Sequence, residues 1–301
     1  MSLVYVFNNY GGPETEALID RDAPVPGPGE IGLEVRAAGV NPADWKLREG
    51  QLGRGFAVPV PMGQEVSGVV TAVGAAVEGF KVGDEVFGVP APGRGGFAEH
   101  TTMRASEALA KPAGISFADA ATIPVAATAA YDLTHVVDLD AGSSVLILGA
   151  GGGVGYMAAQ ICAVHQFRTV TVASEAKREL LEATGASFVP SGAGVPDAVR
   201  ELFPEGVDLV IDLVGGQALR DVAGLAVSPD RVVSAPDPET AAELGGTSRS
   251  TNPESMEKIT EVIAYELVDP HVTATFPLDR VREALAAVET GHAAGKIVVI
   301  P

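Results

Sequence analysis

A glycine-rich turn between a buried strand and a helix constrains this chain more than any other feature. The turn reads Gly-Ala-Gly-Gly-Gly-Val-Gly over residues 149–155, directly after the apolar run 144–148 and before a helical pattern at 153–165. Glycines let the backbone bend tightly and approach a pyrophosphate, whose charge is held by N–H groups of the helix start. Many glycine-rich turns are plain loops, but the strand–turn–helix context favours a dinucleotide. The expected contacts are Gly149, Gly152, Gly153, Val154 and Gly155.

Strands and helices alternate from about residue 123 onward, which predicts a parallel, doubly wound α/β sheet. Residues 1 to about 120 instead carry short apolar stretches between turns, the pattern of a β-rich barrel or sandwich. A last helix and strand follow the α/β region, and we expect this strand to return to the first domain. The predicted strands are 144–148, 169–173, 207–212, 231–234 and 296–300, and the predicted helices are 153–165, 175–184 and 279–290.

The end of the second α/β strand indicates which dinucleotide binds. An NAD-binding domain typically has an acidic side chain there, which holds the ribose 2′-OH. This chain has Ser174, followed by Lys177 and Arg178, so a 2′-phosphate would meet a hydroxyl and two cations. The alternative is a serine that caps a helix with solvated charges. Because cations in a first helical turn oppose the helix dipole, we favour NADPH over NADH.

The length, net charge and cysteine content of the chain limit which classes of protein it can belong to. The 301 residues suggest two domains, and the formal net charge of −19 disfavours nucleic acid and anionic membrane surfaces as partners. No apolar run approaches the roughly 20 residues of a membrane-spanning helix. The single cysteine, Cys162, has no disulfide partner, and the first residues lack a signal-peptide pattern. We therefore expect a cytoplasmic protein that acts on a small molecule.

These features, with further motifs, resemble medium-chain dehydrogenase/reductases of the quinone oxidoreductase type, zeta-crystallin-like proteins included. The resemblance covers almost the whole chain. It implies an α/β fold in which a GroES-like β-rich substrate domain, residues 1–122 completed by 268–301, accompanies a Rossmann NADP-binding domain, residues 123–267, with the active site in the cleft. The further motifs are 38–44 (AGVNPAD), 63–68 (GQEVSG), 82–86 (VGDEV), 95–99 (GGFAE), 208–216 and 291–298.

The resemblance implies hydride transfer from NADPH to a quinone or an α,β-unsaturated carbonyl without zinc. Zinc-containing members carry a Cys near the position of Asn41 and a His where Gln64 stands, and neither replacement is a good zinc ligand. The five histidines, at 100, 135, 165, 271 and 292, show no ligand spacing. We therefore predict no metal. The alternatives are an enoyl-thioester reductase and a non-catalytic NADPH-binding sensor or structural protein.

Three residues are catalytic candidates by this resemblance. Asn41 and Asp44 would face the nicotinamide or the substrate, although Asn-Pro is also a common turn and Asp a local cap. Tyr131 would either donate a proton or only pack. The acceptor would lie near Trp45, Phe56 and Tyr131, with residues 91–96 as a lid. No strong general acid is evident, which suits enolate-like products that take a proton from water.

The resemblance also implies further cofactor contacts. Thr128 matches a threonine that touches the cofactor in relatives, and Lys296 matches a lysine near it. Val214, Gly215 and Ser234 follow or end strands of the α/β domain, where loops reach a dinucleotide. Ordinary turns and a surface lysine are the competing interpretations. A homodimer would pair through the sheet edge after Ser234, but residues 244–252 are polar and glycine-rich, a loop pattern that weakens this expectation.

Overall fold

The computed structural model describes residues 1–291 and 293–301, so His292 lies outside the described residues. The chain divides into two compact units. Unit 1 comprises residues 1–126 and 270–301, and unit 2 comprises residues 127–269. In the described ranges, no helix is long and apolar enough to cross a membrane.

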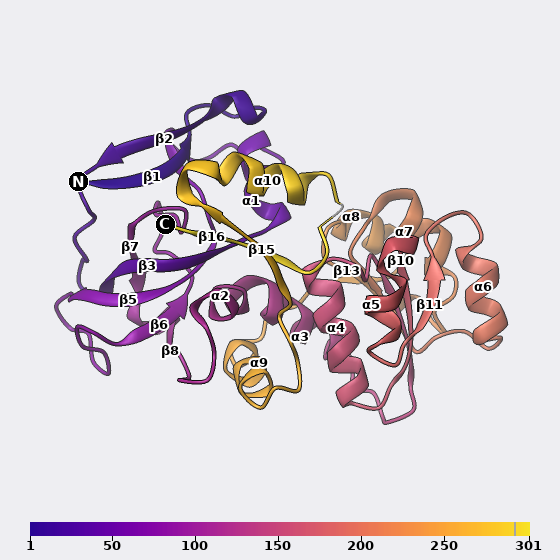
Figure 1. The fold of residues 1–301 in the computed structure, drawn as a ribbon. Coiled ribbons are helices and arrows are strands. Elements are labelled where there is room, and N and C mark those ends of the chain that lie inside the picture. The colour runs from indigo at the N-terminus through magenta and orange to yellow at the C-terminus, as the bar shows by residue number, and fades with distance from the viewer. Residues whose placement is uncertain (292) are drawn as a thin grey trace. The chain divides into compact units, whose positions relative to one another are not determined.

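Unit 1 is built on two β-sheets (Figure 1). The small sheet has the order β2-β1-β4, and the larger one has the order β15-β16-β3-β5-β6-β8, with β7 also paired to β3. The last strand, β16, pairs antiparallel with β3, so it returns to the first part of the chain as predicted. The strands are β1 (Ser2–Phe7), β2 (Glu16–Arg21), β3 (Glu30–Val40), β4 (Val60–Pro61), β5 (Glu65–Val73), β6 (Glu85–Gly88), β7 (His100–Arg104), β8 (Ala108–Ala110), β15 (Val272–Pro277) and β16 (Lys296–Ile300).

The helices of unit 1 are α1 (Pro42–Glu49), α2 (Phe117–Ala120) and α10 (Val281–Glu289). Helix α1 starts directly at the end of β3, because Asn41 is extended and Pro42 occupies the first helical position, where its missing N–H costs nothing. The helix ends at Gly50, whose φ of 81° few other residues adopt readily. Because both the start and the end of α1 are fixed in this way, the side chains of its first turn have defined directions.

Unit 2 is a six-stranded sheet in the order β11-β10-β9-β12-β13-β14, in which all the pairs are parallel. Numbered from β9, this is the order 3-2-1-4-5-6 of a Rossmann domain, so the predicted doubly wound sheet is confirmed. The strands are β9 (Ser144–Leu148), β10 (Arg168–Ala173), β11 (Ser187–Pro190), β12 (Leu209–Asp212), β13 (Val232–Ser234) and β14 (Thr247–Ser248). The helices are α3 (Thr128–Thr134), α4 (Gly153–Val164), α5 (Arg178–Glu182), α6 (Val195–Leu202), α7 (Gly216–Ala223), α8 (Pro238–Glu243) and α9 (Ser255–Ala264).

Two elements of unit 2 differ from the sequence prediction. The predicted helix 175–184 begins as a 3-10 turn, Glu175–Lys177, before α5. The segment 244–252, predicted as a loop, contains the two-residue edge strand β14. Gly246 explains that strand, because a Cβ there would lie 2.6 Å from the carbonyl oxygen of Val232, so glycine is what lets this segment run against β13.

Candidate functional site

The glycine-rich turn follows β9 and leads into α4 as predicted. Gly149 has a φ of +85°, which favours glycine. A Cβ on Gly155 would lie 2.5 Å from the Ala150 Cα, so α4 packs directly against the turn, whereas a Cβ on Gly152 would meet no atom within 4 Å. The first N–H groups of α4, from Gly153 onward, have no acceptor inside the helix. The turn therefore combines an open backbone with a helix start, which fits a pyrophosphate.

Strand β12 ends in a buried carboxylate, Asp212, that the sequence analysis missed. Strands β9 and β12 are adjacent, and the sheet order reverses between them. Asp212 ends β12 with no exposed surface. Its Oδ1 accepts the N–H groups of Val214 and Gly215, both at 2.9 Å, and its Oδ2 accepts the Ser234 hydroxyl at 2.6 Å. Asp212 thus fixes all three predicted cofactor contacts at this edge. The sequence signal that could have identified Asp212 is an acidic residue at the end of an apolar strand, shortly before Val-Gly-Gly at 214–216.

Lys177 is the cation that lies against the glycine turn. A Cβ on Gly151 would come within 2.8 Å of the Lys177 Cγ, so the lysine stem packs on the turn itself. The Lys177 N–H donates to the Ser174 carbonyl oxygen at 2.9 Å, which keeps the two residues together after β10. Burial lowers the pKa of Lys177 from its ordinary value. The structure therefore brings Ser174 and Lys177 to the turn.

Arg178, the next residue, is engaged by neighbouring side chains. Its guanidinium donates to Glu175 at 2.6 and 3.1 Å and to Glu182 at 3.0 Å. It also lies over the ring of Phe188, 4.5 Å from the ring centroid. Two carboxylates therefore already neutralise the charge of Arg178 within the chain.

A buried polar cluster holds Asn41 in unit 1. The Asn41 Nδ2 donates to Glu65 Oε1 at 2.8 Å, and the Lys296 ammonium donates to Asn41 Oδ1 at 2.7 Å. Lys296 also donates to Glu65 Oε1 at 2.9 Å and to the Val40 carbonyl oxygen at 2.9 Å. These contacts use all three N–H donors of the ammonium. Lys296 is 4% exposed, so it is a buried partner of Asn41 and not a surface lysine.

Glu65 is the anion at the centre of this cluster, and the sequence analysis assigned it no role. It has no exposed surface. Its second oxygen, Oε2, accepts the N–H groups of Val125 at 2.8 Å and Ala126 at 3.4 Å. Glu65 follows Gln64 in the 63–68 motif, but its lysine partner lies 231 positions later, a distance that no local pattern bridges.

Asp44 is the titratable group that this cluster presents to a cavity. Its Oδ2 accepts the Asn41 N–H at 2.8 Å, while Oδ1 is buried and accepts no hydrogen bond of ordinary geometry in the described part of the chain. Burial, with a smaller contribution from the charge of Glu65, raises the pKa of Asp44 to about 7, against the opposing effects of the Asn41 N–H, the Lys296 charge and the Gly63 backbone N–H. A carboxyl with this pKa carries a transferable proton near neutral pH.

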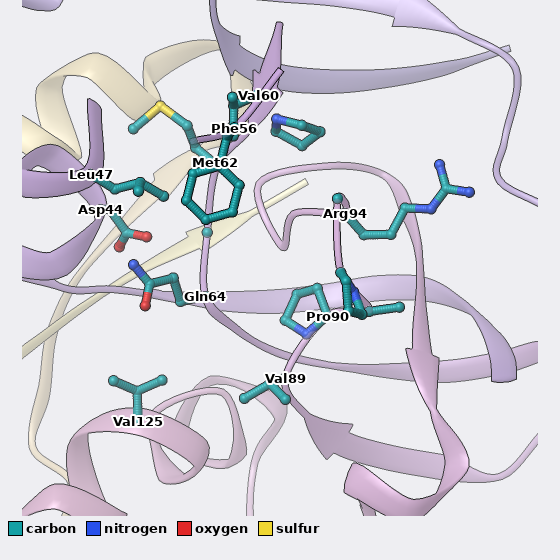
Figure 2. Close-up of a pocket in the computed structure, with 15 residues that line it drawn as sticks. Asp44, Leu47, Phe56, Val60, Met62, Gln64, Val89, Pro90, Arg94 and Val125 are labelled. Atoms are coloured by element: carbon teal, nitrogen blue, oxygen red, sulfur yellow. The ribbon is translucent and has the colours of Figure 1, made fainter. Parts of the chain in front are cut away.

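The cavity beside Asp44 lies within unit 1 and has a volume of about 270 Å³. In the view of Figure 2, Asp44 and Gln64 lie on one side of the cavity and the Arg94 side chain extends away on the other. The predicted residue Phe56 lines it, as do residues 91–94 of the predicted lid segment 91–96, whereas Trp45 is not among the lining residues. The apolar lining includes Leu47, Phe56, Val60, Met62, Val89, Pro90 and Val125.

The two site candidates on α3 have different surroundings. Tyr131 stacks on the ring of His135 with centroids 3.9 Å apart and an interplanar angle of 14°, a contact that supports the packing interpretation. Thr128 is the first residue of α3 and is 8% exposed. Its burial leaves little of the side chain to meet solvent.

The donor atoms of the site do not fit a zinc ion. The Asn41 amide is occupied by Glu65 and Lys296, and a buried ammonium beside the cluster would repel a cation. Burial raises the pKa of Cys162 to about 12, which keeps that thiol protonated. Among the described residues, no group of three His, Cys, Asp or Glu side chains is placed to hold a metal ion.

Comparison with known proteins agrees with this geometry. Residues 27–113 match the family model described as alcohol dehydrogenase GroES-like domain, and residues 184–299 match the model described as zinc-binding dehydrogenase. The 2-methylene-furan-3-one reductase of Solanum lycopersicum is 32% identical over 90% of this chain and 72% of the relative. The chloroplastic NADPH-dependent alkenal/one oxidoreductase of Arabidopsis thaliana is 31% identical over 99% of this chain and 79% of the relative.

A solved structure extends the likeness over both units. The quinone oxidoreductase from Coxiella burnetii superposes with a TM-score of 0.91 at 25% identity, and the match covers all of both chains. The motifs, the strand order and these relatives agree. The chain therefore belongs to the medium-chain dehydrogenase/reductase superfamily, in its quinone oxidoreductase branch.

Proposed function

We propose that this chain is a zinc-independent, NADPH-dependent oxidoreductase that reduces a quinone or the C=C bond of an α,β-unsaturated carbonyl compound. The observation that carries the proposal is the open glycine turn at the reversal point of the unit 2 sheet, with Lys177 packed against it. The names of the tomato and Arabidopsis relatives support the same class of acceptor.

The dinucleotide is held by residues of unit 2. The turn from Gly149, with the N–H groups of Gly152, Gly153, Val154 and Gly155 around the start of α4, takes the pyrophosphate. Ser174 and Lys177 take the 2′-phosphate, with Arg178 as a weaker, already paired contributor. When bound, the nicotinamide supplies a hydride.

The remaining contacts orient the cofactor. Val214, Gly215 and Ser234, fixed by Asp212, lie at the carboxyl ends of β12 and β13, where a Rossmann sheet binds its ligand. Thr128 adds a hydroxyl, and Tyr131 adds a ring fixed by stacking. Lys296 acts through Asn41, because its ammonium is fully used inside the chain.

Asp44 is the proton donor in this proposal. Addition of a hydride to an enone or a quinone leaves a negatively charged oxygen or an enolate, which needs one proton. The protonated Asp44 carboxyl lines the apolar cavity that would hold the acceptor, and its Oδ1 has no competing hydrogen bond of ordinary geometry among the described residues. Asn41 keeps the other oxygen in place.

The test is oxidation of NADPH and NADH with 2-alkenals and 1,4-quinones. We expect turnover, and we expect Lys177→Ala to raise the KM for NADPH roughly 10- to 100-fold, the size of a lost charge-assisted hydrogen bond, while the KM for NADH changes little. Arg200→Ala is the matched control, because Arg200 is an exposed cation of unit 2 paired with Asp197.

Two outcomes would contradict the proposal. Equal effects of Lys177→Ala on both dinucleotides would remove the 2′-phosphate role. Tight NADPH binding without turnover of any acceptor in the panel would instead make the chain a binding protein.

A further inference from the structure

Two exposed histidines meet at the ends of neighbouring helices in unit 2. Helices α3 and α4 pack against each other (Figure 1), and His135 caps the C-terminus of the first while His165 caps that of the second. Their Nε2 atoms are 3.1 Å apart, although the residues are 30 positions apart in the sequence. Sequence spacing therefore gave no sign of this pair.

The hydrogen bonds of His135 fix which ring nitrogen faces its partner. His135 Nδ1 lies 2.8 Å from the Tyr131 carbonyl oxygen, which only accepts, so Nδ1 carries the proton. The lone pair of the neutral ring is then on Nε2, toward His165. A ligating histidine typically has this arrangement, with its second nitrogen donating to a carbonyl. Stacking on Tyr131 for His135 and on Phe167 for His165 restrains both rings.

The separation of the two Nε2 atoms suits a shared metal ion. With metal–nitrogen bonds of about 2.0–2.1 Å, two imidazoles lie about 3.3 Å apart at a tetrahedral angle and about 2.9 Å apart at a right angle. The observed 3.1 Å falls between these values. When His165 takes the tautomer protonated at Nδ1, the Nε2 lone pairs of both neutral rings are available to the same metal ion. Binding of the ion then releases no proton from either ring.

The surrounding charges are compatible with a cation. Both rings stand at helix C-termini, where the backbone carries partial negative charge. Charged groups near His135 are Lys258 on α9, which opposes a cation, and Asp132 on α3, which favours one and is itself paired with Arg249. No third His, Cys, Asp or Glu ligand is placed beside the pair in the part of the chain that the structure describes, so water would complete the coordination.

We propose that His135 and His165 form a surface binding site for a divalent transition metal ion such as Zn²⁺ or Cu²⁺. Imidazole nitrogen is a preferred ligand for both ions. The site joins the ends of α3 and α4, and although His135 stacks on Tyr131, the hydride transfer proposed above needs no metal ion. It therefore stands or falls independently of the oxidoreductase activity.

The test is calorimetric titration of the untagged chain with Zn²⁺. We expect one ion per chain, with affinity reduced at least about tenfold in either His135→Gln or His165→Gln, because each change removes one of two ligands. The double variant, which keeps neither ligand, should bind at least as weakly as either single variant. The matched control is His100→Gln, since His100 lies in unit 1 and contacts Ser2.

A second measurement needs no variant. Electron paramagnetic resonance of the Cu²⁺-loaded wild-type chain should show coupling to two imidazole nitrogens. Coupling to fewer than two nitrogens, or an affinity that the His100 change lowers as much as the His135 change, would overturn the proposal.

Discussion

Asp44→Asn should make the chain more stable at high pH and less active at the same time. The folded chain buries this carboxyl and raises its pKa from 3.8 to about 7. An acid whose pKa is raised by folding binds its proton more tightly in the folded state. Its contribution is therefore complete below about pH 4 and is lost as the pH rises through 7.

The size of the effect follows from the two pKa values. At about 1.4 kcal/mol for each pH unit, the interval from 3.8 to about 7 corresponds to roughly 4 kcal/mol of unfolding free energy. Between pH 5 and pH 8 the loss from Asp44 alone is roughly 2.5 kcal/mol. Asparagine keeps an acceptor for the Asn41 N–H but carries no charge, so the variant escapes this loss.

The assay is urea unfolding of wild type and variant at several pH values between 5 and 8. Trp45, the only tryptophan of the chain, follows Asp44 in α1, so its fluorescence reports the unfolding of unit 1. Asp22→Asn, at an exposed carboxyl of the same unit, is the control and should keep the wild-type pH dependence. In parallel, the variant should lose the fall in kcat/KM above about pH 7 and turn over more slowly at pH 6.

A single comparison would refute this reasoning. If Asp44→Asn changed the unfolding free energy equally at pH 5 and pH 8, Asp44 would not bind its proton more tightly when folded, and its role as proton donor would lose its basis.

Three substitutions and one chelator treatment test the rest of the site. Lys296→Met leaves the buried Glu65 without its cation, and we expect urea denaturation to show a loss of roughly 3–5 kcal/mol, with a loss below about 1 kcal/mol contradicting the buried ion pair. Gly155→Ala places a methyl group 2.5 Å from the Ala150 Cα and should lower both the Tm and the NADPH affinity. The methyl group of Gly152→Ala meets no atom of the described chain within 4 Å, so this change should leave the Tm unchanged and weaken NADPH binding at least about tenfold. Dialysis against a chelator should leave alkenal reduction unchanged, and activity that returns only with added zinc would contradict the metal-free site.

The sequence predicted those parts of the molecule that depend on neighbours along the chain. The strand, turn and helix around Gly149 follow from an apolar run, glycine spacing and helical periodicity, all within about 20 residues. The parallel sheet follows from the alternation of such units. The edge strand β14 was missed because its cause is not its own composition but the close approach of Gly246 to Val232.

The direction in which adjacent side chains point could not be predicted from the sequence. Lys177 and Arg178 are adjacent and equally charged, yet one packs on the glycine turn and the other is held by Glu175 and Glu182. Which of them packs on the turn depends on where the 3-10 turn Glu175–Lys177 ends and α5 begins. The sequence motif identifies both residues as candidates but does not predict which of them contacts the turn.

The pKa of Asp44 depends on contacts that only the fold creates. The sequence showed an acid near Asn41 but no reason for it to hold a proton. Burial supplies most of that reason, and Glu65, brought from β5, supplies a further part.

The cluster around Asn41 also limits what that residue does in the proposed reaction. Because Oδ1 accepts from Lys296 and Nδ2 donates to Glu65, the amide has one orientation. Reversing it would set a donor against the ammonium and an acceptor against the carboxylate. These two contacts therefore hold the Asn41 amide in a fixed direction next to Asp44, which accepts the Asn41 N–H. The ion pair of Lys296 and Glu65 therefore positions a neutral amide beside an acid that holds its proton near pH 7. That combination suits protonation of an enolate better than removal of a proton from an alcohol.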